Sequence, residues 1–148
     1  GKTFFVTGKI NLLVKKGYKV GTIKHAHHDF DIDKPGTDSF KHRKSGASEV
    51  IISSSKRWAK ITEHKNNNEK KLNELVREFI NVDLIIVEGF KRENHPKIEI
   101  ISQNSKFVNN EIKNVVAIVA DQKIKSNIPL FMRNDVESLT EFIINKFL

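Results

Sequence analysis

The chain has 148 residues and no cysteine, and 26 Lys and Arg against 18 Asp and Glu give a formal net charge of +8. This length suits one domain, and the lack of cysteine excludes disulfides and thiolate metal sites. No apolar run approaches the roughly 20 residues of a membrane span, and no signal peptide is visible, so we expect a cytoplasmic protein without membrane contact. The basic residues recur as pairs without an aromatic RNA-binding signature, which argues against a nucleic-acid partner.

Apolar periodicity, turn residues and caps divide the chain into alternating strands and helices. In the first half we expect a strand over 3–7, a helix over 9–16, a strand over 18–24, a loop over 25–36, a helix over 38–45 and strands over 49–55 and 57–62. In the second half we expect a helix over 69–80, strands over 83–87, 97–101, 115–120 and 129–132, and a last helix capped by Asp135. The central strands are apolar throughout, which predicts a three-layer α/β domain with a mostly parallel sheet and helices on both faces.

The first crossover is short for a parallel connection. It has roughly eleven residues, whereas such a crossover needs a dozen or more. We therefore expect that a phosphate-binding loop and the first turn of its helix belong between Gly8 and Lys9, within a single domain over 1–148. The alternative takes Gly1-Lys2-Thr3 as the tail of a phosphate loop, which would place residues 4–8 in a helix against their propensities.

Histidines and carboxylates are concentrated in residues 23–39, directly after an expected strand. The candidate ligands are His25, His27, His28, Asp29, Asp31 and Asp33. In an extended chain the odd-numbered members point to one side, where they could hold Mg²⁺ or a transition metal. The alternative is a polar loop whose Asp side chains satisfy turns. Pro35, Gly36, Thr37, Asp38 and Ser39 then predict a turn into a helix, either as an anion site or as ordinary capping.

Two further carboxylates follow apolar strands. The strand over 83–87 leads to Glu88 and Gly89, where the carboxylate would bind Mg²⁺ or orient water and the glycine would let backbone approach a phosphate. Asp121 follows the strand over 115–120 and could accept the two N–H donors of a guanine base. Ordinary strand-end residues remain the alternative in both cases.

The segment over 23–36, Ile-Lys-His-Ala-His-His-Asp-Phe-Asp-Ile-Asp-Lys-Pro-Gly, resembles the signature of the MobB family of molybdopterin-guanine dinucleotide biosynthesis proteins. Ser-Lys-Arg-Trp-Ala at 55–59, Leu-Ile-Ile-Val-Glu-Gly-Phe-Lys at 84–91 and Asp-Val-Glu-Ser-Leu at 135–139 extend the resemblance over nearly the whole chain. One departure is that no glycine-rich phosphate loop follows Gly8. Another is Thr37, which stands where the family is expected to have Lys.

The resemblance implies a P-loop NTPase fold that binds GTP with Mg²⁺ and hydrolyses it weakly. It implies an accessory role to a MobA-type guanylyltransferase, which joins GMP to molybdopterin, and a homodimer. Carried onto this chain, Glu88 would be catalytic, and the metal would be held by Asp33 and Glu88. The nucleotide would contact Gly8, Lys24, His25, Gly89, Lys91 and Asp121. A switch or cofactor loop would contain His27, His28, Asp29, Asp31, Lys34, Pro35, Gly36, Asp38 and Ser39.

Two other classes of function remain open from the residues. One is a metal-dependent hydrolase that uses the cluster from His25 to Asp33. Its His-x-His-x-Asp pattern resembles that of metallo-β-lactamase-like hydrolases, with Phe30 in place of the last His. The other is a basic, non-catalytic binding module, whose affinity for nucleic acid would fall steeply with salt.

Overall fold

The computed structural model describes residues 2–26, 28–66, 68–102 and 112–148. They form two compact units, one of Gly1–His25 with Leu72–Leu148 and the other of Ala26–Lys71. The single domain expected over 1–148 stays a prediction. Within the described part of the chain, no helix is both long enough and apolar enough to cross a membrane.

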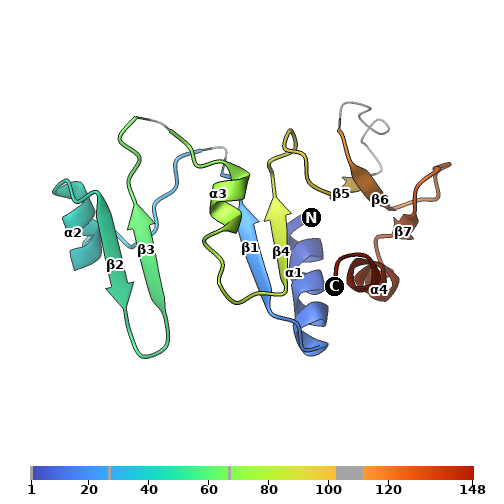
Figure 1. Ribbon diagram of the computed structural model, residues 1–148, viewed down its shortest axis with the longest axis horizontal. Coiled ribbons are helices and arrows are strands. Elements are labelled where there is room, and N and C mark those ends of the chain that lie inside the picture. The colour runs from blue at the N-terminus through green and yellow to red at the C-terminus, as the bar shows by residue number, and fades with distance from the viewer. Residues whose placement is uncertain (1, 27, 67, 103–111) are drawn as a thin grey trace. The chain divides into compact units, whose positions relative to one another are not determined.

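The first unit is built on parallel strands. Its elements are α1 (Lys2–Lys15), β1 (Val20–Lys24), α3 (Leu72–Val76), β4 (Leu84–Glu88), β5 (Lys97–Ile101), β6 (Val115–Ala120), β7 (Leu130–Met132) and α4 (Val136–Phe147). Strands β1 and β4 run in the same direction (Figure 1), in a register that sets Lys24 opposite Glu88. Strands β5, β6 and β7 form a second parallel sheet in that order.

The second unit consists of one helix and one hairpin. Helix α2 (Asp38–Lys44) is followed by β2 (Glu49–Ser53) and β3 (Trp58–Thr62), which pair antiparallel in Figure 1. Helix α2 packs on β2, where Val50 is buried. The parallel pairing in the first unit agrees with the expected sheet, whereas the hairpin pairs only with itself among the described strands.

The strand expected over 3–7 is wrong, because these residues lie in helix α1. The helix is held by tertiary packing: Leu13 is fully buried, and Phe5 packs against the core of Val119, Leu139 and Ile143. Packing of this kind overrides the strand propensity of a short segment. The alternative, with residues 4–8 helical, agrees with the structure.

Helix α1 also removes the reason for placing a phosphate loop between Gly8 and Lys9. The helix crosses both residues without a break. Lys9 is buried at this point, and its Nζ donates a hydrogen bond to the Val136 carbonyl oxygen at 2.6 Å. A Gly-Lys-Thr sequence therefore stands where α1 begins, with Gly1 itself outside the described residues.

The helix expected over 69–80 is shorter than predicted. Helix α3 covers Leu72–Val76, and the hydrogen bonds Glu78 N to Leu75 O and Phe79 N to Val76 O then form turns instead of helix. The Phe79 ring lies so close to Gly21 in β1 that a Cβ on Gly21 would sit 2.6 Å from it. Helix α3 therefore ends before Phe79, whose ring packs on β1.

The last helix confirms the sequence analysis. Asp135 caps α4 by accepting a hydrogen bond from Ser138 N at 3.1 Å, which explains why the helix begins at Val136. On its apolar face Leu139 and Ile143 pack with Val119 of β6. This contact joins the helix to the central strand of the second parallel sheet.

We predict that Leu139→Ala lowers the free energy of unfolding by about 2–5 kcal/mol, because Leu139 is 1% exposed and truncation leaves a cavity against β6. Chemical denaturation would measure the change. Glu141→Ala on the exposed side of the same helix is the matched control and should change stability by less than about 0.5 kcal/mol. Equal losses in the two variants would contradict the assignment of this core.

Candidate functional site

The carboxyl ends of β1 and β4 bring predicted site residues together. Lys24 and Glu88 are register partners, and His25 N donates a hydrogen bond to the Glu88 carbonyl oxygen at 2.8 Å. Glu88 is half-buried and Lys24 is exposed. Ligands of open α/β sheets bind outside the carboxyl ends of the strands, so this edge is the first candidate site.

Gly89 and Phe90 shape the turn that follows Glu88. Both have positive φ, 99° for Gly89 and 50° for Phe90. A Cβ on Gly89 would lie 2.5 Å from the His25 Cβ, and the His25 ring lies 4.7 Å from the Phe90 ring. Glycine is thus required beside His25. Lys91 follows, exposed, in the same turn.

We predict that Gly89→Ala destabilises the protein by about 1–2 kcal/mol or more, because a side chain at positive φ is strained and would push His25 away. Thermal or chemical unfolding would measure this change. Gly8→Ala is the contrasting control: its Cβ would meet no atom within 4 Å, and alanine favours helix α1 by up to about 1 kcal/mol. A Gly89→Ala protein as stable as the parent would refute the steric account of this turn.

Gly8 and Asp121, which the sequence analysis placed at the nucleotide, line a common pocket of about 360 Å³. Gly8 comes from α1, and Asp121 follows β6. Arg133 lines the pocket as well, and its Nε lies 2.7 Å from Asp121 Oδ1. Next to the pocket residues Phe5 and Val136, burial lowers the pKa of Lys9 to about 8.

The sequence analysis did not identify Arg133 or Phe5 as site residues. Arg133 follows β7, twelve positions after Asp121, and no local motif links the two. Phe5 had been assigned to a strand. Only the parallel pairing of β6 with β7 and the true course of α1 place these side chains on the same pocket.

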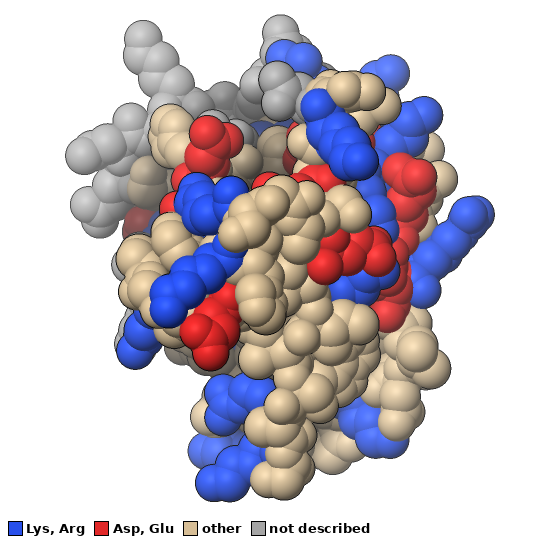
Figure 2. Space-filling model, turned by 90° about the vertical axis from the view of Figure 1, so that its left-hand side faces the viewer, with Lys and Arg blue, Asp and Glu red and all other residues tan. Residues whose placement is uncertain are grey.

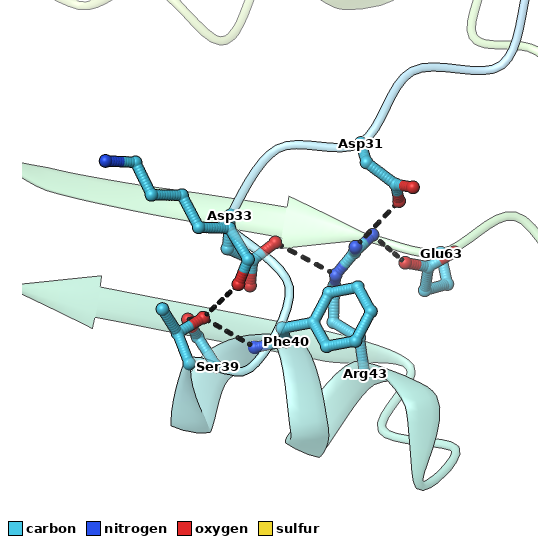
Figure 3. A network of polar contacts seen from close by, with 8 residues as sticks. Asp31, Asp33, Ser39, Phe40, Arg43 and Glu63 are labelled. Carbon is cyan, nitrogen blue, oxygen red and sulfur yellow. Dashed lines mark hydrogen bonds and ion pairs between the residues drawn. The ribbon is translucent and has the colours of Figure 1, made fainter.

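The acidic loop before α2 is held by Arg43. Figure 3 shows the Arg43 guanidinium between three carboxylates, with Nη2 to Asp31 Oδ1 at 3.0 Å, Nε to Asp33 Oδ1 at 3.2 Å and Nη1 to Glu63 Oε1 at 2.8 Å. The side chains of Arg43 and Asp33 are 8% and 4% exposed. The cluster thus joins the loop, α2 and the end of the hairpin within the second unit.

Arg43 changes what Asp31 and Asp33 can do. The hydrogen bond from Arg43 holds the pKa of Asp31 below its ordinary value. Asp33 adopts a positive φ of 85° and points into the ion pair, so a metal would have to displace the guanidinium to reach it. Among the described residues, no three His, Asp or Glu side chains are placed to hold a metal ion.

Most of the remaining loop residues that the structure describes are exposed. His28, Asp29, Lys34, Pro35, Gly36 and Asp38 are exposed, Ser39 is half-buried, and His27 lies outside the described residues. Thr37 is the N-cap of α2: its Oγ1 accepts from Phe40 N at 3.4 Å and donates to the Lys34 carbonyl oxygen at 2.8 Å. Of the two interpretations of this turn, capping is the one visible in the structure.

We predict that Arg43→Met raises the pKa of Asp31 toward its ordinary value of 3.8, because the charge-assisted hydrogen bond is lost. A carboxyl NMR titration would measure this pKa. A lowered pKa stabilises the fold above the unfolded-state value, and this contribution is lost as pH falls through the folded-state pKa. Lys41→Met, which removes only the 3.5 Å contact with Asp38, is the control. An unchanged Asp31 titration in Arg43→Met would contradict the arrangement in Figure 3.

The charges on the visible face of the molecule are mixed. Figure 2 shows Lys and Arg side chains next to Asp and Glu side chains, with uncharged surface between them. Within the second unit, Lys60 and Glu49 form an ion pair at 2.8 Å. A nucleic-acid footprint would instead gather basic residues on one surface, so this face gives no support to the basic binding module.

Comparison with known proteins places the chain in a defined group. A family model described as Molybdopterin guanine dinucleotide synthesis protein B (MobB) matches residues 1–121. The Escherichia coli K12 protein named molybdopterin-guanine dinucleotide biosynthesis adapter protein is 38% identical over 97% of this chain and 85% of its own length. A Haemophilus influenzae protein of the same name is 33% identical over 98% of this chain and 82% of its own length.

Solved structures agree with the fold. A crystal structure of molybdopterin-guanine biosynthesis protein B is similar with a TM-score of 0.75 and 25% identity, covering 97% of this chain and 91% of that one. Bacillus subtilis MobB has a TM-score of 0.76 at 21% identity, covering 100% and 91%, which supports the fold alone. The expected P-loop NTPase-like α/β fold is confirmed.

Proposed function

This chain belongs to the MobB family, and on that premise we propose that it is a GTP-binding adapter protein in the biosynthesis of the guanine dinucleotide form of molybdenum cofactor, with weak GTPase activity. The observation that carries the proposal is the family match, which spans residues 1–121 and thus the end of the β1–β4 pair with Glu88, as well as Gly8 and Asp121 of the pocket. The adapter role named for the relatives is transferred to this chain as part of the proposal.

The nucleotide phosphates are proposed to bind where α1 begins. A Gly-Lys-Thr sequence that opens a helix is the arrangement that ends a phosphate-binding loop, with backbone N–H groups and a lysine for the phosphates. This replaces the loop expected after Gly8. Lys24 and Lys91, both exposed near the end of the β1–β4 pair, are proposed to offset phosphate charge.

Glu88 is proposed as the catalytic and Mg²⁺-linked carboxylate. It lies at the carboxyl end of an apolar strand, with Gly89 leaving room for backbone approach and His25 bonded to its carbonyl oxygen. A single carboxylate suits Mg²⁺, which takes few protein ligands, so Glu88 would hold the ion and the ion would offset phosphate charge. Asp33 is the weaker candidate, because its buried ion pair with Arg43 competes with any metal.

The exposed acidic loop is proposed as a switch or cofactor-contacting segment. Asp29 and His28 are exposed, and Phe30 is 67% exposed, which leaves this segment accessible to a partner. The proposed partners are enzymes of the same pathway, in particular a MobA-type guanylyltransferase, together with molybdopterin. A homodimer in the cytoplasm completes the proposal.

A metal-dependent hydrolase is not favoured. That function needs several ligands converging on one ion, and in the part of the chain that the structure describes no such group of three exists. Two of its intended ligands, Asp31 and Asp33, are bound to Arg43 instead.

We predict that Glu88→Gln slows GTP hydrolysis by roughly 100-fold or more while the dissociation constant for GTP changes much less, because the amide keeps the shape but loses the charge that orients water or Mg²⁺. Single-turnover hydrolysis and equilibrium titration would separate the two effects. Glu93→Gln, an exposed residue in the turn after β4, is the matched control and should leave both unchanged. Full hydrolysis by Glu88→Gln would remove the role given to this residue.

A further inference from the structure

A pocket lies beside α1 in the first unit. Its volume of about 360 Å³ lies within the usual range for small-molecule sites. The lining combines apolar groups, Phe5, Met132 and Val136, with the polar side chains of Asp121, Arg133 and Asn134. Gly8 completes it without a side chain, and a Cβ there would point into open space.

The polar groups are contributed by the ends of adjacent parallel strands. Asp121 follows β6, and Arg133 and Asn134 follow β7, which pairs with β6 up to Met132. Arg133 Nε lies 2.7 Å from Asp121 Oδ1, and Arg133 Nη2 donates to the Ile101 carbonyl oxygen at 3.3 Å. Arg133 thereby links the ends of β5, β6 and β7 and fixes the direction of the Asp121 carboxylate.

These groups define which ligand edge would fit. An ionised carboxylate accepts several hydrogen bonds, so Asp121 can take N–H donors while one oxygen remains paired with Arg133. The Arg133 guanidinium and the Asn134 amide can donate to a carbonyl oxygen, and Phe5, Met132 and Val136 supply apolar surface for a flat ring. The complementary ligand is therefore planar, with two neighbouring N–H donors and a carbonyl.

We propose that this pocket recognises the 2-amino-4-oxo-pyrimidine edge that guanine and pterin rings share, with Asp121 as the acceptor for its N–H groups and Arg133 as the residue that positions Asp121. Adenine does not fit, because it presents an acceptor nitrogen and an amino group where guanine presents an N–H and a carbonyl. The inference rests on the proposed function for its ligand, and it identifies the edge of that ligand which the first unit would bind.

The test compares the dissociation constants of GTP, ITP, ATP and 6-hydroxymethylpterin for the full chain. ITP differs from GTP only by the missing 2-amino group, so we expect it to bind roughly 10- to 100-fold more weakly, the effect of losing one hydrogen bond to a charged group. ATP should bind no better than ITP. The ratio of two constants measured on one sample does not depend on the folded fraction, which protects the test from partly unfolded variants.

Variants assign the preference to the pocket. Asp121→Asn should abolish the GTP-over-ITP preference, and Arg133→Lys should reduce it, because an ammonium cannot hold both contacts of the guanidinium fork. Glu137→Gln, exposed in the first turn of α4, is the control and should keep the preference.

Each outcome separates the inference from the function beneath it. Equal binding of GTP, ITP and ATP would overturn the inference while leaving nucleotide binding intact. Pterin binding that depends on Asp121, without nucleotide binding, would support the inference and assign the edge to a pterin while removing the GTP proposal. A GTP preference without pterin binding assigns the edge to guanine. Binding of none of the four ligands, or a preference unaffected by Asp121→Asn, would overturn the inference.

Discussion

The parallel register of β1 with β4 is the constraint on which the candidate site depends. It sets Lys24 opposite Glu88, and the hydrogen bond from His25 N to the Glu88 carbonyl oxygen carries the pairing one residue further. The backbone at Gly89 lies so close to His25 that a Cβ on Gly89 would be 2.5 Å from the His25 Cβ, so no side chain fits there. Gly89 also has a positive φ, at which the turn toward Lys91 begins. A shift of this register would move Lys24 away from Glu88 and His25 away from Gly89.

Arginines play a similar part in the two units. In the second unit Arg43 forms ion pairs with Asp31, Asp33 and Glu63. These ion pairs offset the repulsion between the carboxylates and hold the acidic loop in one conformation. In the first unit Arg133 holds Asp121 at the pocket beside α1. Each arginine uses its planar fork of donors to bond partners on different segments in a fixed geometry. Asp31, Asp33 and Asp121 are thus positioned by arginine side chains.

The strands and the last helix were predictable because their signals are local. The apolar run of β6 and the Asp135 cap of α4 each lie within one short segment, and the structure confirms both. Residues 3–7 were not predictable in this way, since their β-branched and aromatic side chains favour a strand while the packing of Leu13 and Phe5 selects a helix.

The contacts of the sites depended on pairing at a distance. Arg43 reaches Asp31 and Glu63 across 12 and 20 positions, and Arg133 meets Asp121 only after β7 has joined β6. No spacing rule reveals such pairs, so the sequence pointed to the carboxylates without their arginines. The motif at 84–91 located Glu88 and Gly89 correctly at a strand end, but the contact between Gly89 and His25 needed the fold.

The most direct measurement is a crystal structure of the full chain with Mg²⁺ and a non-hydrolysable GTP analogue. Our account predicts phosphates at the beginning of α1, the ion within reach of Glu88 directly or through water, and the guanine edge against Asp121 in the pocket of the first unit. Phosphates bound away from the beginning of α1 would contradict the account. So would a base that does not contact Asp121, or an ion that Glu88 reaches neither directly nor through a water molecule.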